Sequence, residues 1–187
     1  MRSKNSTSAD LTESRIDSTE LYRGRSFSFM TDRVRLPDGR EAKKDYVKYP
    51  HAVGIVPFFE DGRVLLIRQF RYPAGVELFE IPAGKIDDPA EAPLLAARRE
   101  LREETGFEAE AITPILSYFP CAAYSTEVIH LFRAEGLRAG ATDPDDDEFI
   151  ENAVFSYPET LEMIRDGRIR DGKTILSLSA LRAVFGK

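Results

Sequence analysis

Two apolar segments near the middle of the chain constrain its fold most strongly. They are HAVGIVPFF at 51–59 and RVLLIRQF at 63–70, and Glu60-Asp61-Gly62 separates them. Short runs rich in Val, Ile and Phe around a Gly-containing turn predict a hairpin of two buried central strands. A chain of 187 residues, 42% of them hydrophobic, is long enough to bury one substantial core around such strands.

Other short β-type runs surround this pair. Strands are expected in LYRGRSFSFM, RVRL and AKKDYVKY, with a turn at Pro37-Asp38-Gly39, and later in ELFEIP, AITPILSYF, STEVIHLFRAE and ENAVFSY. The segment AGKIDDPAEA is expected to be irregular. A helix is predicted over 93–105, because Pro93 suits its first turn and Gly106 the position after its last. Two more helices are expected to begin near Tyr157 and Lys173. Clustered strands with helices late in the chain predict a mixed α/β (α+β) sandwich.

The chain divides into three expected regions. Residues 1–20 are rich in Ser, Thr and charge and poor in apolar residues, which predicts a flexible tail. Residues 21–49 are expected to form N-terminal antiparallel strands, and residues 50–187 one catalytic domain.

Charge and cysteine content narrow the classes of function. The formal net charge of −6 and the pI near 5.1 argue against nucleic acid as a main partner. The lone Cys121 cannot form an internal disulfide, and no stretch has the length of a signal-peptide core or a membrane span. These features predict a cytoplasmic protein that is not bound to a membrane.

The predicted helix carries a cluster of carboxylates. Glu100 and Glu104 are four residues apart and Glu103 is three from Glu100, so all three project from one side. Such a cluster suits Mg²⁺, which prefers carboxylate oxygens, water and substrate phosphate. The alternative is a solvated face on which neighbouring arginines pair with the glutamates.

The surrounding residues favour the metal site. Gly84, Glu91, Arg99, Glu100, Leu101, Glu103, Glu104, Gly106 and Phe107 together closely resemble the signature of the Nudix hydrolases, a loop-helix-loop that binds metal and diphosphate. The family pattern has five residues between the first glycine and the next glutamate, whereas six separate Gly84 from Glu91 here. This resemblance implies a Nudix-type α/β/α sandwich. It also implies Glu100, Glu104, nearby Glu103 and the Ala83 carbonyl as ligands of Mg²⁺, with Mn²⁺ as a substitute.

A wider resemblance, over about 46–181, points to the branch that hydrolyses ADP-ribose and other nucleoside diphosphate sugars. LLIRQFRYP, EIPAGKID and GRIRDGKTILSL carry it. Arg68 and Arg71 are expected to hold phosphate or ribose oxygens, unless they are ordinary surface arginines. Glu80 is expected to bind sugar or base, with a cross-strand ion pair as the alternative. FPCAAYSTE partly resembles the loop near the terminal sugar and implies Glu127 as a substrate contact.

The acidic segment DPDDDEF precedes the predicted strand at ENAVFSY. In related pyrophosphatases a glutamate of this region acts as general base or extra metal ligand, which implies Glu148 here and Asp146 as second choice. The alternative is a solvated charged turn. Arg99 and Glu103 complete the expected catalytic set, with Arg99 orienting a carboxylate.

Several alternatives stay open at this level. The same chemistry could act on GDP-mannose or another sugar nucleotide, and a non-catalytic ADP-ribose sensor is a rival that the intact glutamates disfavour. Hydrolysis of oxidised nucleoside triphosphates is disfavoured by the strands before Tyr46, which resemble a dimerising extension. That extension implies a homodimer whose residues 21–49 pair across a two-fold axis.

Overall fold

The computed structural model describes residues 10–140 and 149–184, and they form two compact units. The N-terminal unit contains the described residues up to Tyr49 together with Cys121–Thr126. The core unit contains Pro50–Pro120 and the described residues from Glu127 onward.

Two sheets form the middle of the core unit. The first is mixed and has the order β7-β4-β9-β8, with β4 and β9 parallel; its strands are β4 (Ala52–Pro57), β7 (Ala83–Lys85), β8 (Phe107–Tyr118) and β9 (Ile129–Ala139). The second is antiparallel and has the order β10-β5-β6; its strands are β5 (Arg63–Arg71), β6 (Val76–Glu80) and β10 (Ile150–Ser156). A short 3₁₀ turn, Tyr72–Ala74, links β5 to β6.

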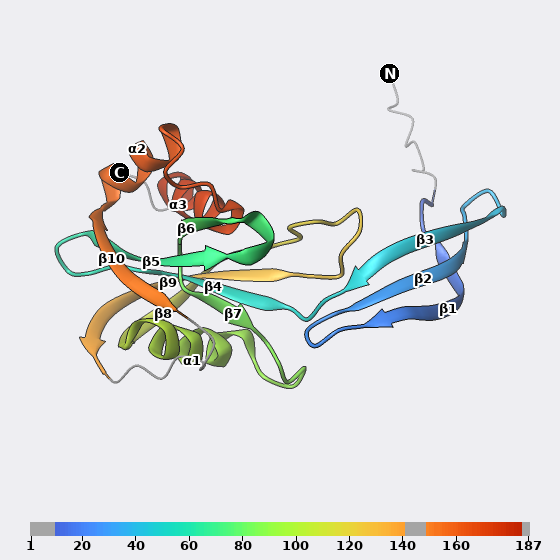
Figure 1. Ribbon diagram of the computed structural model, residues 1–187, viewed down its shortest axis with the longest axis horizontal. Coiled ribbons are helices and arrows are strands. Elements are labelled where there is room, and N and C mark those ends of the chain that lie inside the picture. Colours follow the sequence, from blue (N-terminus) through green and yellow to red (C-terminus); the bar gives the residue numbers. More distant parts are fainter. Residues whose placement is uncertain (1–9, 141–148, 185–187) are drawn as a thin grey trace, which may run out of the picture. The chain divides into compact units, whose positions relative to one another are not determined.

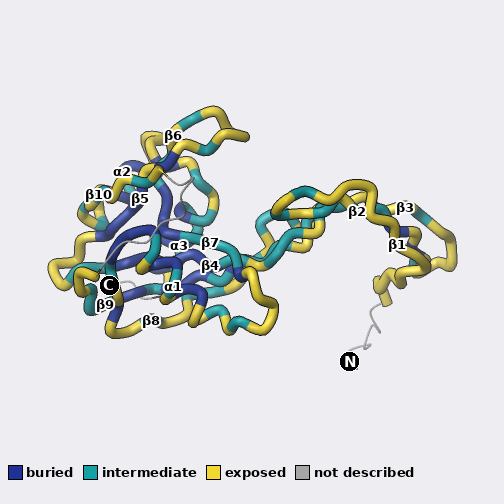
Figure 2. The backbone as a smooth tube through the Cα atoms, turned by 60° about the horizontal axis from the view of Figure 1, so that its bottom comes forward, coloured by how far each residue is buried: buried dark blue, intermediate teal, exposed yellow. Residues whose placement is uncertain are grey.

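Helices cover the strands from both sides. Helix α1 (Pro93–Thr105) lies on one side, and α2 (Tyr157–Arg165) and α3 (Gly172–Val184) lie on the other (Figure 1). Alternate residues of β4 serve the two cores, as the two-residue period of a strand requires: Val53 and Ile55 pack in the cluster with α1, and Val56 in the cluster with α2 and α3. Figure 2 shows the buried stretches gathered on these strands and on the inward faces of the helices. The predicted α/β/α sandwich is therefore confirmed.

The predicted central hairpin is only partly correct. Its turn forms, with hydrogen bonds from Phe59 N to Arg63 O and from Gly62 N to Phe59 O. Beyond one bridge between Phe58 and Val64, however, β4 and β5 enter different sheets, because β4 pairs instead with β7 and β9. The segment predicted to be irregular also begins with a strand, β7, which pairs with β4.

The N-terminal unit is an antiparallel sheet in the order β1-β2-β3. Its strands are β1 (Ser14–Arg23), β2 (Ser28–Arg35) and β3 (Glu41–Lys48). The predicted flexible tail is therefore wrong for Ser14–Glu20, while residues 1–9 lie outside the described residues. Every residue of β1 is exposed, so no apolar alternation marked the strand, and backbone pairing with β2 holds it.

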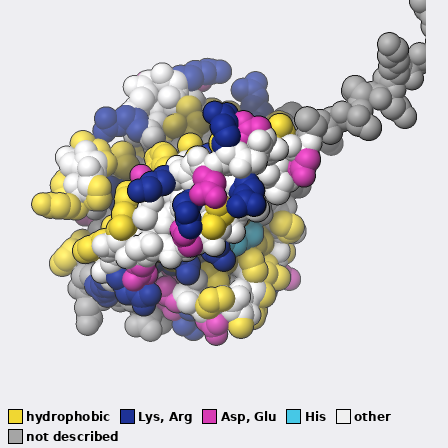
Figure 3. Space-filling model, turned by 90° about the vertical axis from the view of Figure 1, so that its right-hand side faces the viewer, with side chains coloured by type: hydrophobic (Ala, Val, Ile, Leu, Met, Phe, Trp, Pro, Cys, Tyr) yellow, Lys and Arg dark blue, Asp and Glu magenta, His cyan; other side chains and the backbone are white. Residues whose placement is uncertain are grey.

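Charge on the surface is mixed in sign where it can be seen. Figure 3 shows basic and acidic side chains interspersed over the face it displays. Within residues 10–140 and 149–184, no helix has the length and apolar character needed to cross a bilayer.

Candidate active site

Helix α1 holds its glutamates against the sheet. Pro93 stands in its first turn, and Gly106, at φ 73°, ends it in the left-handed region that glycine adopts without strain. Ala97 and Leu101 are fully buried in the core below. Glu100 and Glu104 lie beside this apolar stripe and are only 9% and 6% exposed. These two carboxylates are therefore not part of a solvated face, and burying them requires partners.

The chain around Gly84 comes very close to these carboxylates. The Ala83 amide donates to Glu104 Oε2 at 2.9 Å. A Cβ placed on Gly84 would lie 2.0 Å from Glu100 Cδ, which no side chain can tolerate. Gly84 is required here because the backbone of β7 lies directly against the Glu100 carboxylate.

Arg99 joins the remaining glutamates. Its Nη1 donates to Glu100 Oε1 at 2.7 Å and to Glu103 Oε2 at 2.9 Å, and its Nη2 donates to the Lys85 carbonyl at 3.1 Å. Contacts of 3.4 Å also join it to both oxygens of Glu91. Although burial opposes the charge, the carboxylates of Glu91, Glu100 and Glu103 raise the pKa of Arg99 above its ordinary value. Glu91 thus stays within reach of Arg99 despite the extra residue between Gly84 and Glu91. A loop accommodates such an insertion at little cost in free energy.

The donor set suits a hard divalent cation. Three carboxylates surround one guanidinium, so negative charge exceeds positive charge, and the available donors are all oxygens. They border a cavity of about 560 Å³ lined by Ala83, Gly84, Lys85, Asp87, Asp88, Glu91, Arg99, Glu100 and Glu103. Among the described residues, no three His, Cys, Asp or Glu side chains form a preassembled metal site.

A second buried ionic cluster joins β5, β6 and α3. Glu80 is 1% exposed. Both of its oxygens accept hydrogen bonds from Arg71, each at 2.8 Å, and Lys173 Nζ donates to its Oε2. Burial by itself would raise the pKa of Glu80, but Arg71 and Lys173 outweigh it and hold the pKa below its usual value. The predicted alternative for Glu80, an ion pair between strands, is thus present.

Arg71 also lies near enough to Glu104 of α1 to interact with its charge. Its pKa is raised first by the hydrogen bonds to Glu80 and then by the nearby charges of Glu104 and Asp171. Arg71 is partly exposed, with 37% of its side chain accessible. A guanidinium that is fixed by a buried carboxylate and still reaches solvent is well placed to meet a substrate anion.

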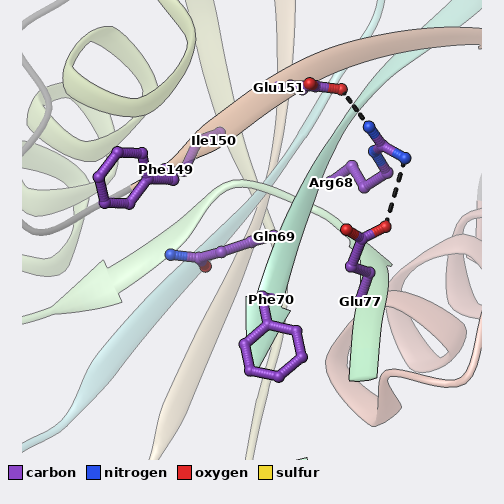
Figure 4. Close-up of a pocket in the computed structure, with 7 residues that line it drawn as sticks. All are labelled: Arg68, Gln69, Phe70, Glu77, Phe149, Ile150 and Glu151. Atoms are coloured by element: carbon purple, nitrogen blue, oxygen red, sulfur yellow. Dashed lines mark hydrogen bonds and ion pairs between the residues drawn. The ribbon is translucent and has the colours of Figure 1, made fainter. Parts of the chain in front are cut away.

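The structure separates Arg68 from Arg71. The two residues are three apart on β5, so they project from opposite faces of the strand. Arg68 pairs with Glu151 at 2.6 Å and Glu77 at 3.3 Å, and Figure 4 shows this group on the opposite side of β5 from Gln69. Gln69 shares its face of β5 with Arg71. The Arg68 side chain therefore points away from Arg71 and its Glu80 partner.

The other predicted residues have different outcomes. Glu127 is half-buried, and burial raises the pKa of its carboxyl while the charge of Lys173 opposes that shift. Glu148 and Asp146 lie outside the described residues.

Sequence reasoning missed Lys173 as a partner of Glu80. The GRIRDGKTILSL segment contained this lysine, but no pattern indicated that its side chain is only 12% exposed and bound to Glu80, 93 residues away.

Comparison with known proteins points to one family. The NUDIX domain profile matches residues 48–178. The chain is 33% identical to the methanol dehydrogenase activator of Bacillus methanolicus, over 91% of this chain and 92% of that protein. It is 31% identical to the ADP-ribose pyrophosphatase of Bacillus subtilis strain 168, over 92% and 94%. It is 39% identical to the GDP-mannose pyrophosphatase of Yersinia enterocolitica, over 63% and 65%.

A solved structure described as an ADP compounds hydrolase has the same fold. Its TM-score is 0.82 at 22% identity, and the match covers 93% of this chain and 95% of that one. The domain match and the glutamate helix that it contains define the class: this chain belongs to the Nudix family of hydrolases.

Proposed function

We propose that the protein hydrolyses the pyrophosphate bond of ADP-ribose or a related nucleoside diphosphate sugar with Mg²⁺, giving a nucleoside monophosphate and a sugar phosphate. The observation that carries this proposal is the pair of buried carboxylates on α1: Glu100 lies against the Gly84 backbone and borders an open cavity, and Glu104 accepts a hydrogen bond from the Ala83 amide. The names of the Bacillus subtilis and Yersinia relatives support a sugar nucleotide as substrate.

The metal would be held by Glu100, Glu104, Glu103 and the Ala83 carbonyl. When bound, Mg²⁺ neutralises diphosphate charge and lowers the pKa of a water molecule. Mn²⁺ presents the same octahedral oxygen chemistry and would substitute.

The side chains supply position and charge. Arg99 orients Glu100 and Glu103 through charged hydrogen bonds. Arg71, fixed by Glu80, would bind a phosphate oxygen, and Glu127 would contact the sugar end of the substrate. Arg68 lies on the opposite face of β5 and so would not bind the same phosphate oxygen as Arg71. The proton of the attacking water would go to a carboxylate of the acidic segment, Glu148 first and Asp146 second.

GDP-mannose is the alternative substrate, because the diphosphate is common to both. We also propose a homodimer through residues 21–49, supported by strand β1 of the N-terminal unit, all of whose residues are exposed, and a cytoplasmic location, supported by the single cysteine.

Product analysis tests the proposal. The purified protein is incubated with ADP-ribose or GDP-mannose and Mg²⁺, and nucleotides are separated by chromatography. AMP with ribose 5-phosphate, or GMP with mannose 1-phosphate, is the expected result. Cleavage of neither substrate, by protein with intact secondary structure, would contradict it.

A further inference from the structure

Part of the loop between β8 and β9, Cys121–Thr126, belongs to the N-terminal unit. Val47 N donates to Tyr124 O at 2.8 Å, and Thr126 N donates to Val47 O at 3.1 Å. These two bonds make a parallel bridge between Val47 and Ser125. The loop is itself turned back by bonds from Tyr124 N and Ser125 N to the Cys121 carbonyl, at 3.0 and 2.9 Å. Cys121–Thr126 is thus bound to β3 and its continuation by backbone hydrogen bonds.

The Thr126 hydroxyl adds a clamp at the end of this loop. Thr126 Oγ1 accepts a hydrogen bond from Tyr49 N at 2.9 Å and donates one to Tyr49 O at 3.0 Å. One hydroxyl therefore satisfies both backbone groups of a residue 77 positions away. A hydroxyl group can supply a donor and an acceptor from one atom in this way, whereas the isosteric valine can supply neither.

The clamp lies next to a predicted substrate contact. Glu127 follows Thr126 directly, so their Cα atoms are about 3.8 Å apart. Glu127 is half-buried, and Lys173 of the Glu80 cluster is close enough for its charge to act on the carboxyl. Because the two residues are directly bonded along the chain, a rotation of the backbone at Thr126 would change the direction of the Glu127 side chain.

We propose that Thr126 is a positioning residue: its hydroxyl, bound to the Tyr49 backbone, fixes the Cys121–Thr126 loop and so places Glu127 for the sugar end of the substrate. The proposal rests on the proposed function. The expected change is in binding of the sugar end, and not in the glutamates on α1.

Three variants test the proposal on the 187-residue chain with ADP-ribose and Mg²⁺. Thr126→Val keeps the shape and removes both hydrogen bonds, Thr126→Ser keeps the hydroxyl, and Thr113→Val is a matched control on the exposed part of β8. For Thr126→Val we expect KM to rise about tenfold with kcat within about twofold of the unaltered chain. Thr126→Ser and Thr113→Val should retain KM.

Hydrogen exchange provides a readout that does not depend on activity. In Thr126→Val the Tyr49 amide should exchange faster because its acceptor is gone, while the Val47 amide, bonded to Tyr124 O, should stay protected and show that the sheet is folded.

Two results would overturn the proposal. One is an unchanged KM in Thr126→Val despite faster exchange at Tyr49; the other is a loss in Thr126→Ser equal to that in Thr126→Val. If the unaltered chain cleaves no sugar nucleotide, the proposed function fails, and this inference fails with it; if only the variants behave otherwise than expected, the positioning role alone fails.

Discussion

The two units of the chain are stabilised in different ways. In the core unit, residues such as Ile55, Leu66 and Leu131 are at most 1% exposed, and two apolar clusters flank the β4 sheet. In the N-terminal unit, all of β1 is exposed and ion pairs such as Arg33 with Asp17 lie at the surface.

The difference shows where the fold draws its stability. Apolar burial is the main favourable term of folding, so the core unit can hold charged side chains in fixed positions and pay for their desolvation. The N-terminal unit depends on backbone pairing, because exposed ion pairs contribute little. We therefore expect matched substitutions in the two units to differ strongly.

Paired glutamates should give the largest difference. Glu80 in the core unit is 1% exposed and binds two cations, whereas Glu41 in the N-terminal unit is exposed and pairs with Arg33 and Arg35. Glu80→Ala leaves Arg71 and Lys173 without their buried partner and should cost about 3–5 kcal/mol of unfolding free energy. Glu41→Ala should change it little. Urea unfolding measures both, and equal losses would refute the contrast.

Isoleucines offer a second matched pair. Ile55 on β4 is fully buried, and Ile16 on β1 is 37% exposed. Ile55→Ala should cost about 2–5 kcal/mol through lost burial and the cavity it leaves. Ile16→Ala should cost far less unfolding free energy. Hydrogen exchange within each unit measures both losses. A loss at Ile16 as large as that at Ile55 would instead indicate that a second copy of the chain covers β1.

Lowering the pH from about 7 to 5 should reduce the folding stability of the core unit and not that of the N-terminal unit. This is the smallest of the three expected effects. The two histidines of the chain, His51 and His130, lie with ring centroids 5.7 Å apart in that unit, and His130 Nδ1 is 2.8 Å from Ser117 Oγ. Burial, and then the charge of His51, lower the pKa of His130. The unfolded chain therefore binds the proton more readily, and stability falls as the pH drops from about 6.5 toward the lower folded pKa.

His130→Gln measures this effect, because its unfolding free energy should vary less with pH between about 7 and 5 than that of the unaltered chain. Hydrogen exchange should show the acid effect in β4 and β9 and leave β1–β3 unchanged. The same pH dependence in both chains would exclude His130 as its source.

The same contrast explains how much of the fold was predictable from sequence. The helix at 93–105 has its proline, its glycine and its buried residues in helical order, and the structure has the same bounds. β1 has neither period nor burial, so only pairing with β2 reveals it. β4 and β5 each show the apolar character of a buried strand, but which sheet each joins depends on distant partners, above all on β9.

The site was predictable where neighbours along the helix define it. Glu100, Glu103 and Glu104 share a face through helical spacing alone, whereas Lys173 meets Glu80 only because the tertiary fold brings the start of α3 to the end of β6. For Arg68 and Arg71 the signal was present: an odd separation within one strand places them on opposite faces.

Turnover by Glu104→Gln tests the central claim most directly. Gln keeps the size of the side chain and an oxygen that can accept from the Ala83 amide, but it removes the charge that a divalent cation requires. With ADP-ribose or GDP-mannose and Mg²⁺, we expect kcat to fall by about 10²-fold or more, while Glu77→Gln, on an exposed part of β6, retains activity. Full turnover by Glu104→Gln would contradict the metal site on α1.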